Sequence, residues 1–281
     1  MDARFDRAAE DVGNIVKLEH VNVTVPEQRL ATIFYVTGLG LTRDPYLMTG
    51  VDNMWINVGE SQFHLPIGEP QRIRGTIGLV LPDLRALVAR LATVERALAG
   101  TAFAYEPRED AVEVTCPWGN RLRCHAASHA TSGARTLGMA YVELDVPEGA
   151  AAPIAAFYRD VLAAPARVED RTAVVTAGPR QSLRFRETDR PIPRYDGHHV
   201  QVYLADFSGP YRRLFERGLV SMETDRHEYR FIRIVDAAGA TRYELEHEVR
   251  SLRHPLYGRP LVNRNPGQGN RNYVPGRDAW C

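Results

Sequence analysis

The stretch Leu18–Glu27, LEHVNVTVPE, decides the fold because its outline occurs four times in the chain. Apolar and polar residues alternate along it, as they do along a β-strand with one buried face, and a turn with an acidic residue follows. The same outline begins at Gly75 (GTIGLVLPD), Met139 (MAYVELDVPE) and His198 (HHVQVYLAD). Each copy continues into a segment with helical periodicity and then into further strands, so the sequence predicts four repeated modules.

The acidic residues of the four turns align the modules with one another. Seven residues before each acid lie four equivalent positions: His20, Thr76, Tyr141 and His199. The strands that close the modules align in the same way and give a second equivalent set: His64, Arg123, Arg184 and Glu244. Intervals of 43 to 47 residues separate the members of each pair, as duplicated units predict. Because side chains alternate along strands, the first and closing strands of a module can present these residues on one face.

The repeats also set the expected boundaries. We expect an N-terminal extension at 1–15, a first domain of modules one and two at 16–126, and a linker at 127–138. Modules three and four form a second domain at 139–250. The segment 251–281 is dense in Pro, Gly and Asn and is expected to form an extended tail over the body of the protein.

The composition excludes several classes of partner. The 35 basic residues balance the 35 acidic ones, which gives no electrostatic reason to expect nucleic acid or an anionic membrane. The three cysteines are scattered, without the spacing of a thiolate metal site, and fit a reducing compartment. No long apolar run indicates a membrane span. We expect a cytoplasmic protein with a small-molecule substrate, as a monomer or a homodimer.

A module with a histidine in its first strand, a helix containing Phe34-Tyr35 and GLGL (38–41), and a turn such as PWGNR (117–121) before its closing strand resembles the vicinal oxygen chelate superfamily. That group includes glyoxalase I, extradiol dioxygenases and bleomycin-binding proteins. The resemblance covers about residues 16–249. It implies an α+β fold in which four βαβββ modules form two half-barrel domains. Either neighbouring modules pair, as in the extradiol type, or the first pairs with the fourth and the second with the third, as in the fused glyoxalase type.

The resemblance also implies where a metal would bind, since its members take ligands from the first and closing strands of two paired modules. Arginine stays protonated and cannot be a ligand, so modules two and three offer little. We favour pairing of the first module with the fourth because it unites the whole set of ligand-type residues: His20, His64, His199 and Glu244. The site of modules two and three would then be a relic. Three imidazoles and one carboxylate suit Fe(II), which we favour, but also Mn(II), Ni(II) or Zn(II).

Strand alternation predicts the residues around this metal. Those expected on the same face, as a substrate pocket, are Asn22, Gln62, Gln201, Tyr203 and Arg242. A slip of one residue would replace His199 by His198. Trp55 is expected to be a core aromatic rather than a platform for substrate. Other polar residues are expected outside the ligand set: His125, His129, Glu246 and His247.

The resemblance implies a metal-dependent enzyme that acts on a small, oxygen-rich organic substrate. An oxidoreductase of the dioxygenase type is the first expectation, although Tyr141 interrupts the extradiol ligand set. A glyoxalase-like isomerase or lyase, with Glu244 as the catalytic proton-transfer base, is the second, although His64 stands where glyoxalase I has a carboxylate. A metal-free ligand-binding protein is the third. Metal content and oxygen consumption distinguish the three.

Overall fold

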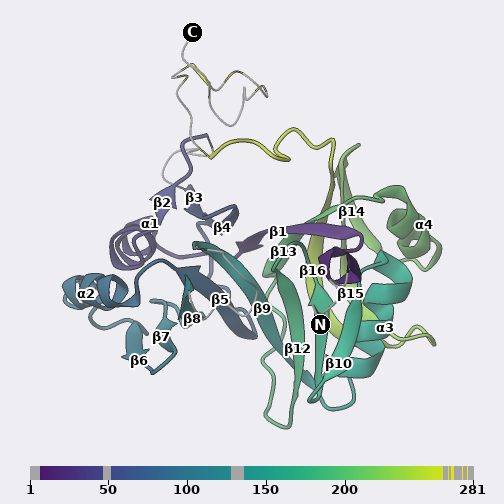
Figure 1. The fold of residues 1–281 in the computed structure, drawn as a ribbon, viewed down its shortest axis with the longest axis horizontal. Coiled ribbons are helices and arrows are strands. Elements are labelled where there is room, and N and C mark those ends of the chain that lie inside the picture. Colours follow the sequence, from purple (N-terminus) through teal and green to yellow (C-terminus); the bar gives the residue numbers. More distant parts are fainter. Residues whose placement is uncertain are drawn as a thin grey trace, which may run out of the picture.

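The computed structural model describes residues 7–46, 52–127 and 136–261, together with residues 265, 267, 268, 274 and 277. Most of the expected linker, His129, Cys281 and most of the tail beyond Leu261 lie outside the described residues. Within them the chain has an α+β fold with two eight-stranded sheets and short helices, as predicted (Figure 1).

Four modules make up the fold after a short 3-10 turn, η1 (Arg7–Glu10). The first contains β1 (Ile15–Asn22), α1 (Gln28–Ala31), the π-helical segment η2 (Thr32–Gly38), β2 (Thr42–Arg43), β3 (Asn53–Val58) and β4 (Ser61–Pro66). The second contains β5 (Gly75–Leu81), α2 (Leu84–Val94), β6 (Ala104–Pro107), β7 (Ala111–Thr115) and β8 (Arg121–Ala126). The third contains β9 (Gly138–Pro147), α3 (Ala151–Leu162), β10 (Ala166–Glu169), β11 (Thr172–Thr176) and β12 (Ser182–Thr188). The fourth contains β13 (His199–Leu204), α4 (Ser208–Glu216), β14 (Val220–Asp225), β15 (Glu228–Val235) and β16 (Thr241–Ser251).

The sheets pair the first module with the fourth and the second with the third. The first sheet has the order β14-β15-β16-β13-β1-β4-β3-β2, and the second β10-β11-β12-β9-β5-β8-β7-β6. The modules of 16–126 and those of 139–250 therefore each divide their strands between the two sheets. Their helices pack in chain order instead, α2 against η2 and α3 against α4, at opposite ends of the molecule (Figure 1). This is the first-with-fourth pairing that the ligand distribution favoured.

One apolar core extends through all four modules in the described residues. A buried side chain also joins the two sheets. β1 has an irregular register between Leu18 and His20, and there the backbone of Leu18 pairs with the side chain of Gln181. The N–H of Leu18 donates to Oε1 of Gln181 over 3.2 Å, and Nε2 of Gln181 donates to the carbonyl of Leu18 over 2.8 Å. The second sheet thus fixes the strand that carries His20.

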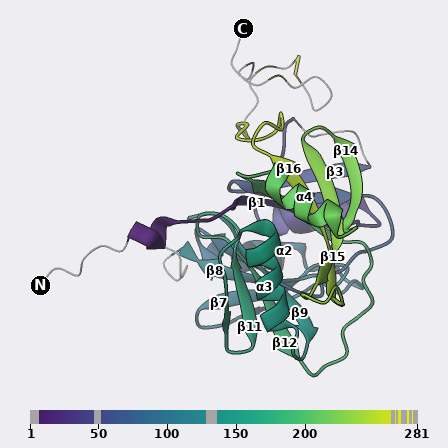
Figure 2. The same ribbon diagram turned by 90° about the vertical axis from the view of Figure 1, so that its right-hand side faces the viewer.

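Modules three and four are also joined by a buried hydrogen bond. Figure 2 turns α3 and α4 toward the viewer. Nδ1 of His247 is 2.8 Å from the carbonyl of Leu245 and donates to it, so Nε2 accepts from the hydroxyl of Tyr158 over 2.6 Å. Tyr158 and His247 are both 0% exposed.

Replacing Tyr158 by Phe should therefore destabilise the protein. Tyr158→Phe leaves the buried Nε2 of His247 without its donor, and we expect the free energy of unfolding to fall by about 1–3 kcal/mol. Urea denaturation followed by circular dichroism measures it. The control is Tyr105→Phe, whose hydroxyl donates to Glu95 at the surface, and it should change the value by less than about 0.5 kcal/mol. Equal effects of the two variants would contradict the importance of the buried bond.

The chain after β16 crosses from module four to module one (Figure 1). Arg259 enters the protein there, with its Nη2 2.5 Å from Oδ2 of Asp44, and its guanidinium lies 5.4 Å from the ring centroid of Tyr46. The side chains of Arg259 and Asp44 are 2% and 0% exposed. Arg259 thus anchors the described part of the tail to module one.

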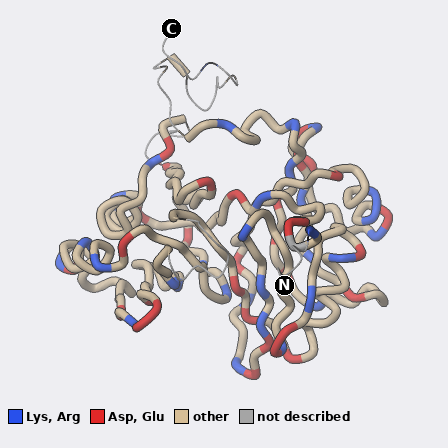
Figure 3. Tube along the Cα trace, viewed as in Figure 1, with Lys and Arg blue, Asp and Glu red and all other residues tan. Residues whose placement is uncertain are grey.

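The described residues contain no helix that is long and apolar enough to cross a membrane. Figure 3 shows basic and acidic residues interspersed along the trace, in agreement with the balanced totals of 35 each.

Candidate metal site

Three histidines meet on one face of the first sheet. β1 lies between β13 and β4, and the register pairs Asn22 with His199 on one side and with His64 on the other. His20 lies two residues before Asn22 and therefore points to the same face. Its ring centroid is 5.8 Å from that of His64 and 5.8 Å from that of His199. The structure thus brings together the three histidines that the repeat alignment selected. The residue at this face is His199 and not the adjacent His198, which precedes β13.

Each of the three rings has one nitrogen atom without a hydrogen bond. One possible ligand atom from each residue lies within 4.8 Å of the other two. Among the described residues, the buried Nε2 atoms of His20 and His64 have no hydrogen-bond partner, and that of His199 has only Oε2 of Glu248 nearby, at 3.3 Å and outside good hydrogen-bond geometry. Buried polar atoms without partners are uncommon in native proteins, because each costs desolvation free energy. Something bound between the rings would satisfy all three.

The surroundings keep the imidazoles in the form that binds metals. Burial lowers the pKa of His20 and lowers the pKa of His64 to about 2, so both rings are neutral near pH 7. Nδ1 of His20 is 3.4 Å from Oε2 of Glu19, and Nδ1 of His199 is 3.5 Å from Oε1 of Glu246. At His20 the carboxylate favours the tautomer with hydrogen on Nδ1, which leaves a lone pair on Nε2, whereas His199 has a carboxylate beside each nitrogen.

The carboxylate that the structure brings to these histidines is Glu248. Its Oε2 lies 3.3 Å from Nε2 of His199, and the residue is 2% exposed. The register gives the same result. His20 pairs with residue 62, and His64 follows two positions later; His199 pairs with residue 246, and Glu248 follows two positions later. Glu248 is therefore the equivalent of His64.

The structure does not bring Glu244 to this cluster, which corrects the expected ligand and catalytic base. Glu244 is exposed and precedes Glu248 by four residues, or about 13 Å along a strand. The alignment placed the ligand too early because β16 has 11 residues whereas β4 has 6, so the fourth hairpin is longer than the first. The register with β1 and β13 aligns QFHLPI (62–67) with EHEVRS (246–251), which matches Glu248 with His64.

Glu248 belongs to a buried network of ion pairs that the sequence did not indicate. Nη2 of Arg230 is 2.6 Å from its Oε2, and Nη2 of Arg250 is 2.6 Å from its Oε1. Arg250 also lies 3.3 Å from Glu228 and 3.5 Å from Glu19. Burial raises the pKa of Glu248, but hydrogen bonding and the charge of Arg250 hold it well below its usual value. The carboxylate is ionised, and each of its oxygens has more than one acceptor site.

Four of the five predicted pocket residues are buried. Asn22 and Gln201 are buried on the face of the histidines, and Oδ1 of Asn22 and both amide atoms of Gln201 have no partner among the described residues. Gln62 is buried there too, but its Nε2 donates to Asp44 over 2.6 Å. Tyr203 is buried, with its hydroxyl 3.5 Å from Oε1 of Glu19.

The fifth predicted pocket residue, Arg242, lies outside the pocket because it precedes Glu248 by six residues along β16. Its guanidinium forms an ion pair with Asp236 at the exposed hairpin, at 2.5 Å.

Trp55 is buried, as expected of a core aromatic, but its contacts are with the site. Its ring stacks on that of His64 with centroids 3.9 Å apart and an interplanar angle of 13°, and its centroid is 4.9 Å from that of His20. The indole thus covers two of the three histidines.

The residues present fit a divalent metal ion. The charged groups around the histidines are the acids Glu19, Glu228, Glu246 and Glu248 and the bases Lys17, Arg230 and Arg250. The acids exceed the bases, so a cation among neutral imidazoles would be compensated. Nε2 of His199 faces Oε2 of Glu248, and a cation bound between the rings would contact both atoms.

Solved structures with the same fold carry two of the expected activities in their names. A putative dioxygenase from Bacillus subtilis superposes with a TM-score of 0.58 at 14% identity, covering 92% of this chain and 89% of that one. Glyoxalase I from Zea mays gives a TM-score of 0.56 at 12% identity, covering 84% and 92%. The cppA protein from Streptococcus pneumoniae gives 0.52 at 11%, covering 86% and 100%. No family model and no curated protein sequence matches. The chain therefore has the vicinal oxygen chelate fold, and the predicted resemblance is confirmed at the level of the fold.

Proposed function

We propose that the chain is a metal-dependent enzyme of the vicinal oxygen chelate type in which His20, His64, His199 and Glu248 hold one divalent transition metal. We favour Fe(II) and a dioxygenase reaction on a small, oxygen-rich organic substrate; Mn(II), Ni(II) and Zn(II) are the other candidate metals. The observation that supports this most is the convergence of the three histidines within 4.8 Å of one another, with the buried Nε2 atoms of His20 and His64 unpartnered and an ionised carboxylate beside them. Four ligands leave two positions of an octahedron, enough for two neighbouring substrate oxygens.

When bound, the metal would supply a Lewis acid that polarises the substrate oxygens. The chain's own residues have separate tasks. Glu19 and Glu246 orient the rings of His20 and His199. The amide groups of Asn22 and Gln201 lie on the same face with hydrogen-bonding capacity to spare, so they are available to orient a substrate. Trp55 covers the ring of His64 and keeps water from that side of it.

Metal analysis after anaerobic reconstitution of the full chain with Fe(II) is the first test. We expect about one metal ion per chain, and we expect His199→Ala to lower the bound metal to trace amounts. His125→Ala removes a histidine of the other sheet and should leave the metal content unchanged. Trace metal in the reconstituted protein, unaffected by His199→Ala, would overturn the proposal in favour of the metal-free ligand-binding alternative.

Oxygen consumption is the second test and separates the two enzyme classes. With catechols or hydroxy-ketones as substrates, a dioxygenase consumes dioxygen in proportion to product, whereas a glyoxalase-like isomerase or lyase turns over without consuming it. The feature that favours the isomerase is a carboxylate beside the metal, which could remove a carbon-bound proton. The low pKa of Glu248 makes it a weak base, however, and supports a role as ligand instead.

A further inference from the structure

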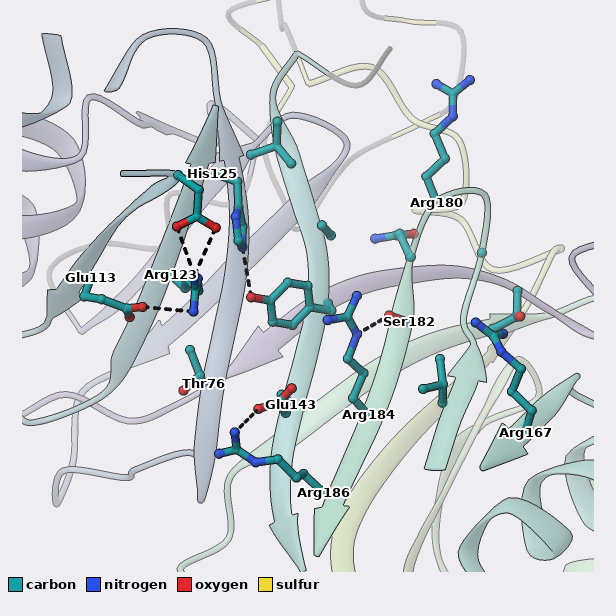
Figure 4. Close-up of a pocket in the computed structure, with 18 residues that line it drawn as sticks. Thr76, Glu113, Arg123, His125, Glu143, Arg167, Arg180, Ser182, Arg184 and Arg186 are labelled. Atoms are coloured by element: carbon teal, nitrogen blue, oxygen red, sulfur yellow. Dashed lines mark hydrogen bonds and ion pairs between the residues drawn. The ribbon is translucent and has the colours of Figure 1, made fainter. Parts of the chain in front are cut away.

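A cavity of about 760 Å³ lies on the second sheet, at the positions equivalent to the candidate metal site (Figure 4). The register of β5 with β8 and of β9 with β12 places four residues where the first sheet has its three histidines and Glu248. They are Thr76, Arg123, Tyr141 and Arg184. The two guanidinium groups exclude a metal ion, since they are protonated and offer no lone pair. In the described part of the chain, His20, His64 and His199 of the first sheet are the residues that come close enough together to share a metal ion.

The side chains at the centre of this cavity are held in place. The ring of Tyr141 fills the space over Gly78, where a Cβ atom would come within 2.2 Å of it. The guanidinium of Arg184 lies 3.9 Å from the centroid of the same ring, and the hydroxyl of Tyr141 is 3.0 Å from Nε2 of His125. Figure 4 shows Arg184 with its contact to Ser182. Stacking on a ring pre-organises a guanidinium, which lowers the cost of binding a partner.

The charges that line the cavity are not balanced. The basic residues are Arg123, Arg167, Arg180, Arg184 and Arg186, and the acidic residues are Asp110, Glu113 and Glu143. Arg123 is paired with both Asp110 and Glu113, at 3.1 and 3.4 Å. Arg186 is paired with Glu143 at 3.3 Å, and Arg167 is paired with a glutamate outside the cavity. The three carboxylates of the cavity are therefore all paired with Arg123 or Arg186, two of its five arginines.

Arg184 and Arg180 are the two arginines of the cavity that these ion pairs leave out. Nε of Arg184 donates to the hydroxyl of Ser182 over 3.1 Å, which leaves the two Nη groups of the fork. Among the described residues, neither Arg184 nor Arg180 has a carboxylate within ion-pair distance. Arg184 is half-buried at the centre, and Arg180 is exposed at the rim (Figure 4). A half-buried guanidinium without a counter-ion favours an anion, because attraction is stronger where solvent screens it less.

We propose that this cavity of the second sheet binds a small organic anion carrying a carboxylate or phosphate group, with Arg184 as the main contact and Arg180 at the entrance. The fork of Arg184 matches two oxygens of either group. The volume lies within the range of metabolite-sized pockets. Burial raises the pKa of Tyr141 to about 12, so its hydroxyl stays protonated and adds no negative charge to the cavity. The proposal does not depend on the metal site, which lies on the other sheet.

Isothermal titration calorimetry on the full chain, treated with EDTA to keep metal out of the first site, tests the proposal. The probes are inorganic phosphate, phenyl phosphate and benzoate, with benzyl alcohol as the neutral control. We expect at least one anion to bind and benzyl alcohol not to bind. Phosphate-bearing and carboxylate-bearing ligands are distinguished by which of the probes binds more tightly. Absence of binding by all three anions up to about 10 mM would overturn the proposal.

Variants locate the binding. Arg184→Gln should weaken the anion about tenfold or more, because it removes charge-assisted hydrogen bonds. Arg180→Gln should weaken it about threefold, as expected of a more exposed contact. The control Arg29→Gln makes the same charge change at the surface of α1 and should have no effect. His20→Ala should also have none.

Equal affinities of Arg184→Gln and Arg29→Gln would contradict the proposal, as would loss of anion binding in His20→Ala. If Arg184→Gln does not fold by circular dichroism, Arg180→Gln decides, because unchanged affinity in that variant would also contradict it.

Discussion

Glu248→Gln should lower the affinity of the protein for a divalent metal by about 100-fold or more, whereas Glu244→Gln should leave it unchanged. Both substitutions remove one negative charge from β16 and nearly preserve side-chain shape. They differ in position, since Oε2 of Glu248 lies 3.3 Å from Nε2 of His199, whereas Glu244 is exposed four residues earlier. Loss of groups that only support a metal ligand already costs about 10- to 100-fold in affinity, so loss of a ligand should cost at least as much.

Competition between the protein and a chelator for Fe(II) under anaerobic conditions measures this difference. Circular dichroism of both variants checks that the fold is retained. A large effect of Glu244→Gln with none of Glu248→Gln would restore the ligand set read from the repeat alignment. Equal affinities of both variants and the parent would remove the carboxylate from the proposed site.

Arg250→Met should lower the free energy of unfolding by about 3 kcal/mol or more at pH 7 in protein treated with EDTA. Arg250 is 8% exposed and lies within 3.5 Å of three carboxylates, those of Glu19, Glu228 and Glu248. Without it, buried negative charges lose the cation that compensates them, which is far more costly than loss of a surface pair. Arg242→Met is the matched control on the same strand. Arg242 is 45% exposed and pairs with Asp236, so its loss should cost less than about 1 kcal/mol.

The loss of stability in Arg250→Met should depend on pH, because it arises from buried carboxylates such as that of Glu19. Burial raises the pKa of Glu19, but its hydrogen bond with His20 and the charges of Lys17 and Arg250 bring it down to about 2, below the ordinary 4.5. A depressed pKa contributes stability above the unfolded value, and that stability is lost as the pH falls toward the folded value. The deficit of Arg250→Met should be full near pH 7 and shrink between about pH 4.5 and 2. A deficit that grows with acidity would contradict the network.

The candidate site was predictable to the extent that each module repeats the same strand register. His20, His64 and His199 could be found because their positions follow from alternation and from the equivalence of the modules. The prediction of Glu244 as the fourth ligand was wrong because it depended on the length of one hairpin, and β16 extends to Ser251. The pairing of Glu248 with Arg230 could not be found, since β15 and β16 meet only through strand pairing.

The amino-acid sequence by itself determined the four βαβββ modules and the helix and strand type of each segment, because periodicity and turn residues act over a few positions. It also determined that ligand-type residues occur only in modules one and four at the equivalent positions. Only the tertiary structure decided that Glu248 faces the histidines, that arginines compensate it, and that the second sheet keeps a cavity with an uncompensated Arg184. These three features depend on contacts between residues far apart in the chain. Such contacts stabilise the protein only after β1 has paired with β13 in one sheet and β5 with β9 in the other.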